Sequence, residues 1–222
     1  MVSTDRHLQL AEVAESQWGM VTTAQAADIA VSAQQLARMT NRGVLQRLHH
    51  GVYLITGVPY DRLTDLKATW LALEPGTLAA ARLDRPDPGG VVSHRSAARV
   101  HGIGDLDADL NEFTVTTARR SRNADTRLHK RALPSSAWEI VDGLPVTTVA
   151  ITISDLAAGT TDGGHLAGVL DDALTQGKIT REEAAAALRP FAHQYGAPLG
   201  AGRELLDRLL AAHDGPPDGV SL

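Results

Sequence analysis

The stretch that decides the fold is TTAQAADIAVSAQQLARMTNRGVLQRLHHGVYLIT, residues 22–56. Two residue spacings in it are typical of capping boxes, in which a hydroxyl side chain and a glutamine close the first turn of a helix. Thr22 is followed three residues later by Gln25, and Ser32 is followed three residues later by Gln35. The stretch therefore predicts two helix starts only ten residues apart.

These starts predict two short helices over 23–30 and 33–42, preceded by a helix over 5–18 that carries an apolar stripe. Two short helices joined by a tight turn form a helix-turn-helix. The β-prone runs 44–49 and 52–56 flank a His-Gly turn, so a hairpin is expected directly after the third helix. Helix-turn-helix and hairpin together predict a winged helix-turn-helix.

The helix over 33–42 has the two faces that a DNA-recognition helix needs. Leu36 and Met39 are expected to face inward, and long hydrogen-bonding side chains recur on the other side. Amides pair well with adenine and guanidinium groups with guanine, so this face is expected in the major groove. A solvated face used for protein contact is the alternative, but such a face would normally include Asp or Glu. The base-reading and phosphate-binding candidates of this helix are Gln34, Gln35, Arg38, Asn41 and Arg42.

The remaining DNA contacts are expected from the helix starts and from the hairpin. Arg47, His49 and His50 are assigned to phosphates or to the minor groove. The other candidates are Thr22, Thr23, Ser32 and Tyr53.

The charge distribution supports this assignment although the chain has a net charge of −5. Residues 29–60 contain no carboxylate, whereas residues 139–222 carry a net charge of −7. A basic front and an acidic rear fit a molecule that meets nucleic acid on one side and another partner on the other. Cysteine is absent, and no apolar stretch reaches the ~20 residues of a membrane span, so a cytoplasmic location and no membrane contact are expected.

The fold class is expected to be α+β, with a domain over 1–60 and a second, mixed domain over 61–222 that is helical from about 148. The β-prone runs 110–117 and 126–133 enclose a polar loop that contains Arg119, Arg120 and Arg122. These arginines are candidates for phosphate or partner contacts, and a solvated loop is equally compatible with the sequence. Further expected elements are helices over 63–73, 93–101, 149–158, 163–176, 181–194 and 202–213, and a hairpin of 138–141 with 144–147.

Three motifs carry a family resemblance: QWGMVTTAQAADIAVSAQQLARMTNRGVLQRLHHGVYLITGVP (17–59), VVSHRSAARVHGIGDL (91–106) and GLPVTTVAITISDLAA (143–158). In this order they resemble AbiEi antitoxins of the actinobacterial type, over roughly residues 10–175. The resemblance implies a type IV toxin-antitoxin system. In it, the winged helix represses its own operon at inverted repeats, and the second domain helps to neutralise a nucleotidyltransferase-like toxin of the AbiEii class.

An enzymatic function is the alternative, in which the winged helix only delivers nucleic acid to a nuclease-like domain. His94 and His101 lie on one helical face, but no third ligand is apparent beside them, so neither a metal nor a cofactor is expected. Asp171 and Asp172 lack the following lysine that nucleases of this kind need. P-loop, GxGxxG and GxSxG motifs are absent, so we expect no catalytic residues.

Overall fold

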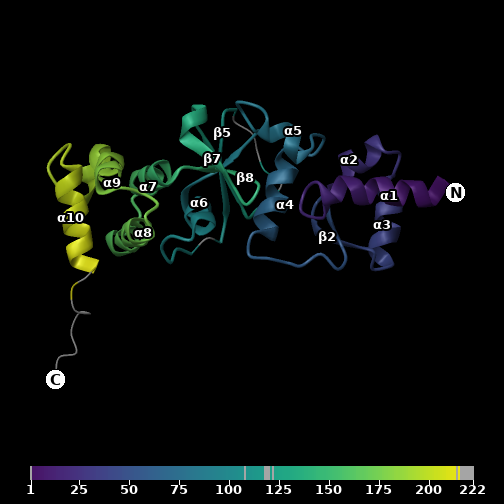
Figure 1. The fold of residues 1–222 in the computed structure, drawn as a ribbon, viewed down its shortest axis with the longest axis horizontal. Helices are drawn as coiled ribbons and strands as arrows, with labels where there is room; N and C mark the ends of the chain where they lie inside the picture. The colour runs from purple at the N-terminus through teal and green to yellow at the C-terminus, as the bar shows by residue number, and fades with distance from the viewer. Residues whose placement is uncertain (1, 108, 118–120, 122, 214, 216–222) are drawn as a thin grey trace, which may run out of the picture. The chain divides into compact units, whose positions relative to one another are not determined.

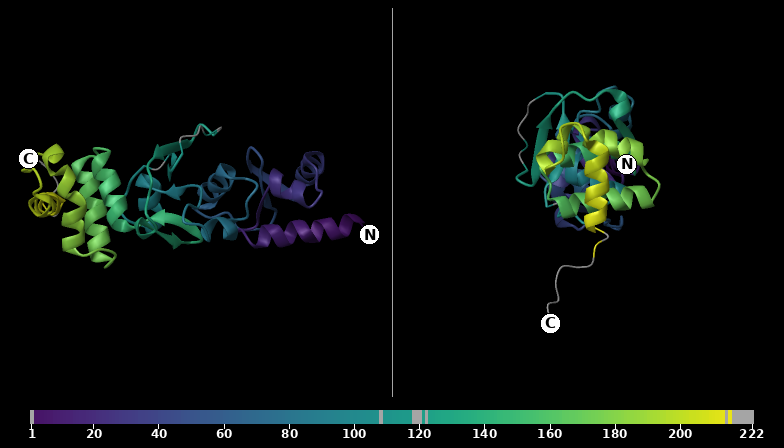
Figure 2. Two further views of the ribbon diagram at one scale, coloured as in Figure 1. Left: turned by 90° about the horizontal axis from the view of Figure 1, so that it is seen from above. Right: turned by 90° about the vertical axis from the view of Figure 1, so that its left-hand side faces the viewer.

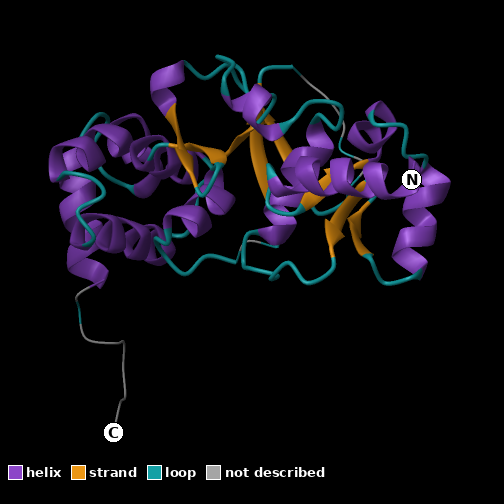
Figure 3. Cartoon of the chain, turned by 45° about the vertical axis from the view of Figure 1, so that its right-hand side comes forward, coloured by secondary structure: helices purple, strands orange, loops and turns teal. Residues whose placement is uncertain are grey.

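The structure is a computed structural model that describes residues 2–107, 109–117, 121, 123–213 and 215. The chain forms two compact units, of which unit 1 comprises Met1–Val91 with Thr114–Ser135, and unit 2 comprises Val92–Phe113 with Ser136–Leu222. Helices and strands occur in both units, so the predicted mixed composition is confirmed (Figure 3). None of the helices in the described part of the chain combines the length and apolarity that a membrane span needs. The domain boundary at residue 60 stays a prediction.

Unit 1 contains the elements predicted from residues 22–56, three predicted from other stretches and two that were not predicted (Figure 1). The unpredicted elements are strand β1 and helix α5. The elements are α1 (Val2–Glu15), β1 (Met20–Thr22), α2 (Thr23–Asp28), α3 (Ala33–Asn41), β2 (Leu45–His49), β3 (Val52–Ile55), α4 (Thr64–Leu73), α5 (Ala79–Leu83) and β6 (Thr126–Lys130). Strand β6 ends at Lys130, and the backbone N–H of the next residue, Arg131, donates to the carbonyl of Val115 at 3.0 Å.

Both predicted capping boxes are present. The Thr22 hydroxyl accepts from the backbone N–H of Gln25, and the Gln25 side chain accepts from the backbone N–H of Thr22. Ser32 and Gln35 repeat this reciprocal pair at the start of α3. Each box satisfies two N–H groups that the first turn of a helix leaves without a partner. The two helices are therefore fixed by local sequence.

The hairpin of β2 and β3 is antiparallel, and β1 joins it on the far side of β3 to give the order β1-β3-β2. The register of β2 shifts between Arg47 and His49, so the strand is irregular just before its turn. Gly51 adopts a φ of +76° in that turn, a conformation that a glycine reaches without strain.

A small apolar core holds α1, α3 and the sheet of unit 1 together. Leu10 and Ala14 of α1 are buried, as is Leu36 of α3. Val31 and Leu36 belong to the same buried cluster, as expected if they staple the start of α3. The other members of this core are Val21, Ala26, Leu45 and Tyr53.

Unit 2 combines a sheet with a helical layer. Its strands follow the order β5-β4-β8-β7, in which β4 and β8 are parallel and β7 and β8 antiparallel. The predicted turn at Asp142-Gly143 is confirmed, with φ of +51° and +78° at these residues. The first elements of the unit are β4 (Val91–Val92), α6 (His94–His101), β5 (Asn111–Val115), a 3-10 turn (Ser135–Ala137), β7 (Trp138–Val141) and β8 (Leu144–Thr147).

From Val149 to His213 the regular elements of unit 2 are all helical, as predicted for the chain from residue 148 onward (Figure 2). The helix expected over 181–194 is shorter in the structure, because α9 stops at Leu188 and gives way to a 3-10 turn that contains Pro190, a residue without a backbone N–H. These helices surround a buried core that includes Ile153, Leu166 and Leu205. The elements are α7 (Val149–Ala158), α8 (Gly163–Thr175), α9 (Arg181–Leu188), the 3-10 turn (Arg189–Tyr195) and α10 (Gly202–His213).

Candidate nucleic-acid interface

Helix α3 presents a polar face to solvent. Gln34, Arg38 and Asn41 are exposed, and their spacing of four and three residues places them on one side of the helix. Leu36 on the opposite side is fully buried, and Met39 packs against the same core. We call Gln34, Arg38 and Asn41 the polar face of α3. The helix is thus attached by one stripe and free on the other.

The residues at the two ends of α3 have structural contacts of their own. The Ser32 and Gln35 side chains are joined to each other's backbone at distances of 3.2 and 2.8 Å, which holds the first turn. Arg42 caps the other end, and its backbone N–H donates to the carbonyl of Arg38 at 3.1 Å. The Arg42 side chain is exposed.

The predicted threonine contacts at the start of α2 are less accessible. Thr22 is fully buried, where its hydroxyl donates to the carbonyl of Pro75 in addition to capping α2. Thr23 is half-buried, and its backbone N–H donates to the carbonyl of Gly51 at 2.9 Å. This bond links α2 to the turn of the hairpin. Both threonines therefore position the elements around α3.

The hairpin turn places a second cationic group in solvent. The exposed Arg47 side chain donates from Nε to the carbonyl of His49 at 3.2 Å, and its Nη2 lies 3.1 Å from Nδ1 of His50. His50 is exposed as well. A guanidinium that is braced at two points loses less conformational freedom when it binds an anion. Arg47 and His50 are thus suited to contact phosphates.

His49 points elsewhere. Its Nε2 lies 2.8 Å from Oδ1 of Asp65 and 3.2 Å from the Thr69 hydroxyl, both on α4. The hydrogen bond to Asp65 raises the pKa of His49 above its usual value, against the effect of burial, which lowers it. Sequence reasoning missed Asp65 because it lies 16 residues beyond the strand, in a helix for which no link to the hairpin was expected.

Tyr53 and the three loop arginines are the remaining predicted contacts. Tyr53 is buried, with 8% of its surface exposed, and belongs to the core of unit 1. The loop arginines Arg119, Arg120 and Arg122 lie outside the described residues.

The residues weighed for catalysis lie in unit 2, where several have structural partners. The Nε2 of His101 lies 2.7 Å from the carbonyl oxygen of Thr147, and burial lowers the pKa of this histidine, so the neutral ring donates there. Two carboxylates that sequence reasoning missed lie near His94. A ring nitrogen of His94 lies within 4.8 Å of a carboxylate oxygen of Glu112, and its Nδ1 lies 3.8 Å from Oδ2 of Asp155. Asp172 accepts from the backbone N–H of Gly104 at 2.7 Å.

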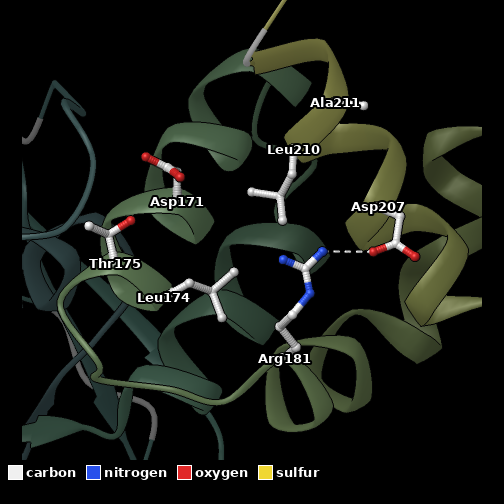
Figure 4. A pocket seen from close by; sticks show the side chains of 7 residues that line it. All are labelled: Asp171, Leu174, Thr175, Arg181, Asp207, Leu210 and Ala211. Atoms are coloured by element: carbon white, nitrogen blue, oxygen red, sulfur yellow. Dashed lines mark hydrogen bonds and ion pairs between the residues drawn. The ribbon is translucent and has the colours of Figure 1, made fainter.

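The neighbouring Asp171 lies at the edge of a hollow of about 480 Å³ between α8, α9 and α10 (Figure 4). Leu174 and Leu210 line its middle, and Arg181 points across it to Asp207, with 2.9 Å between Nη2 and Oδ1. Both side chains of the Arg181–Asp207 pair are exposed, as is typical of a surface ion pair.

Comparison with known proteins gives a match for the part of the chain that carries α3. Residues 8–56 match the model of the family described as transcriptional regulator, AbiEi antitoxin. The span includes most of α1, both capped helices and the three-stranded sheet. No curated protein matches the chain. Residues 8–56 are thus similar to the AbiEi antitoxin family of transcriptional regulators, the family that the sequence motifs resemble.

Proposed function

We propose that this chain is an antitoxin that binds operator DNA through a winged helix-turn-helix formed by α1, α2, α3 and the β2–β3 hairpin, and that it thereby represses its own operon. The observation that supports this most directly is the polar face of α3. Gln34, Arg38 and Asn41 are exposed, they share one side of a firmly anchored helix, and the sequence from 29 to 60 contains no carboxylate that would repel phosphates.

In the proposed complex α3 lies in the major groove. Its amides, Gln34 and Asn41, match the donor and acceptor pattern of adenine, and the Arg38 guanidinium matches guanine. Each good bidentate contact of this kind discriminates against the wrong base by ~1–3 kcal/mol. Arg42, Arg47 and His50 then contact the phosphate backbone on either side of the groove, where they set the register of the helix.

The other predicted contacts take supporting roles in this proposal. Thr22 and Tyr53 are buried, so their side chains hold the domain together. His49 ties the hairpin to α4 through Asp65, which keeps the turn and its arginine in place. Ser32, Gln35 and Thr23 fix the helix starts that face the DNA. The arginines at 119, 120 and 122 remain proposed phosphate or partner contacts.

The remaining parts of the proposal rest on the family and on charge. The operator is expected to be an inverted repeat, and the partner to be a nucleotidyltransferase-like toxin of the AbiEii class in a cytoplasmic type IV system. Residues 1–60 would form the DNA-binding domain, and residues 61–222 the antitoxin domain. The net charge of −7 over 139–222 suits a basic protein surface and disfavours DNA in that region. The chain would act by binding, without catalysis.

The proposal is tested by fluorescence anisotropy with the DNA upstream of the gene and with random DNA of equal length. Arg38→Ala should weaken operator binding and relax base preference, because it removes a base contact. Arg47→Ala should weaken both DNAs alike and reduce the salt slope by about one unit. Arg203→Ala in α10 is the charge-matched control, since Arg203 is exposed and its Nη1 lies 3.6 Å from Oε1 of the likewise exposed Glu182.

Equal losses on random DNA for the Arg38 and Arg47 variants would remove the argument for base readout. Magnesium-dependent cleavage of the same DNA would instead favour the nuclease alternative.

A further inference from the structure

A groove in unit 1 adjoins the surface proposed for DNA. Its volume is about 920 Å³, which is close to the upper end of the ~300–1,000 Å³ typical of small-molecule sites. The walls come from α2, the first residue of α3, the turn of the β2–β3 hairpin and the end of α4, and Ser121 and Asn123 line it from a later segment of the same unit. The function proposed above assigns α3 and the hairpin turn to DNA, and it assigns no ligand to α2 or to the end of α4.

Small apolar side chains create the space in this groove. Ala24 and Ala27 line it from α2, and Ala72 lines it from the last turn of α4, followed by Leu73. Ala27 and Ala72 are exposed, which is expected of alanines that face an open groove and not a packed core. Covering this apolar wall with the body of a ligand removes apolar surface from water, which lowers the free energy of the complex.

The other side of the groove is cationic. Arg47 and His50 line it from the hairpin turn, and the described lining residues include no aspartate or glutamate. Arg47 is already braced by the carbonyl of His49 and by His50, so its guanidinium is held near the groove. Charge complementarity therefore favours an anion at this end.

We propose that the groove binds a small organic anion with an apolar or aromatic body. The body packs between Ala27 and Ala72, and the anionic group pairs with Arg47. A bare phosphodiester would satisfy the arginine but would leave the alanine wall uncovered, which is why a compact amphipathic anion fits better than the DNA backbone. Because Ala33 and the turn line the same groove, a bound anion is expected to change operator affinity. That consequence alone rests on the proposed function.

The binding itself is tested without DNA, so its failure is distinguishable from a failure of the proposed function. The probes are 1-anilinonaphthalene-8-sulfonate and the uncharged N-phenyl-1-naphthylamine, titrated into the full chain while fluorescence is recorded. One saturable site is expected for each dye. Arg47→Ala should weaken the sulfonate about fivefold or more and change the uncharged dye less than about twofold, because only the former pairs with the guanidinium.

Filling the groove gives the second arm. Ala27→Phe and Ala72→Phe, each at an exposed position, should weaken both dyes about tenfold or more, because the added ring occupies the volume they need. Ala81→Phe on the exposed side of α5, away from the groove, is the matched control and should leave both affinities unchanged. Unaltered binding in both groove variants would overturn the proposal. Equal losses of affinity for the two dyes in Arg47→Ala would also overturn it, and so would weak binding of the dyes at many sites.

Discussion

Two adjacent histidines of the hairpin show how much a single residue's surroundings decide. The sequence gives no reason to separate His49 from His50, and both were predicted to contact phosphates. The irregular register after Arg47 turns His49 toward α4, where it pairs with Asp65, and leaves His50 exposed beside Arg47. Position along a regular strand predicts which face of the sheet each side chain points to, but a bulge interrupts that alternation between the two faces.

The contact between His49 and Asp65 should make the stability of the fold depend on pH. The raised pKa of His49 means that the folded chain holds its proton more tightly than the unfolded chain. The stabilisation is therefore complete below the unfolded pKa of about 6.5, and it is lost as the pH rises through the folded pKa. Asp65→Asn should lower the free energy of unfolding by about 1 kcal/mol at pH 5.5, and by less at pH 9.

Urea unfolding of the unchanged chain and of Asp65→Asn between pH 5.5 and pH 9 measures the difference in their free energies of unfolding. His49→Gln combined with Asp65→Asn supplies the control, because the pH dependence assigned to the pair should then disappear. A deficit of Asp65→Asn that grows toward high pH would contradict the assigned sign.

Elements defined by neighbouring residues could be predicted from the sequence, and elements defined by distant partners could not. The starts of α2 and α3 were predicted because each capping box lies within four residues. Strand β1 has three residues and exists because β3 pairs with it, a contact between residues 20–22 and 52–54 that no local pattern reveals. In the candidate interface the exposed face of α3 was predictable from spacing, whereas the hydrogen bond from buried Thr22 to Pro75, 53 residues away, was not.

The capping box of α3 links an element to the proposed activity. Ser32→Ala removes the side-chain acceptor for the N–H of Gln35, which should cost about 1 kcal/mol of stability. Ser32→Asp keeps an acceptor there and should retain the stability, because aspartate is a good N-cap and favours the helix dipole. It also adds a carboxylate beside the polar face of α3.

Operator affinity should therefore fall more for Ser32→Asp than for Ser32→Ala, although the aspartate variant is the more stable of the two. Thermal unfolding and anisotropy titrations measure the two quantities separately. If affinity simply followed stability, the start of α3 would not face the DNA.

Close packing of α9 against α10 depends on one glycine. A Cβ atom on Gly202 would lie 2.0 Å from the carbonyl oxygen of Ala185 and 2.8 Å from the backbone nitrogen of Arg189. Backbone atoms cannot give way as a side chain does, so Gly202→Ala should force the two helices apart and cost about 2–4 kcal/mol. Gly168→Ala in α8 is the control, where the Cβ meets only His213 at an ordinary 3.7 Å. It should be neutral or slightly stabilising in denaturant unfolding.

Across the whole chain, charge divides along the sequence. Residues 29–60 carry no carboxylate, and residues 139–222 carry a net charge of −7. If the rear of the chain binds a basic toxin, exposed acids of the C-terminal helices should matter for neutralisation. Removal of everything after Gly159 is a poor test, since α8 and α10 supply Leu166, Leu170 and Leu205 to the core of unit 2. Such a truncated chain would lose protection by unfolding alone.

Charge reversal at the surface avoids that ambiguity. Asp171→Lys together with Glu204→Lys changes the charge of α8 and α10 by four units without touching the buried core, because Asp171 is half-buried at the rim of a hollow and Glu204 is exposed. If these helices meet a basic surface, co-expression with the toxin should give at least about tenfold fewer surviving cells, while operator binding and melting temperature stay unchanged. Asp105→Lys, also exposed in unit 2 but outside these helices, should protect fully. Full protection by the double variant would instead mean that the acidic charge serves solubility, and that neutralisation depends on other surfaces.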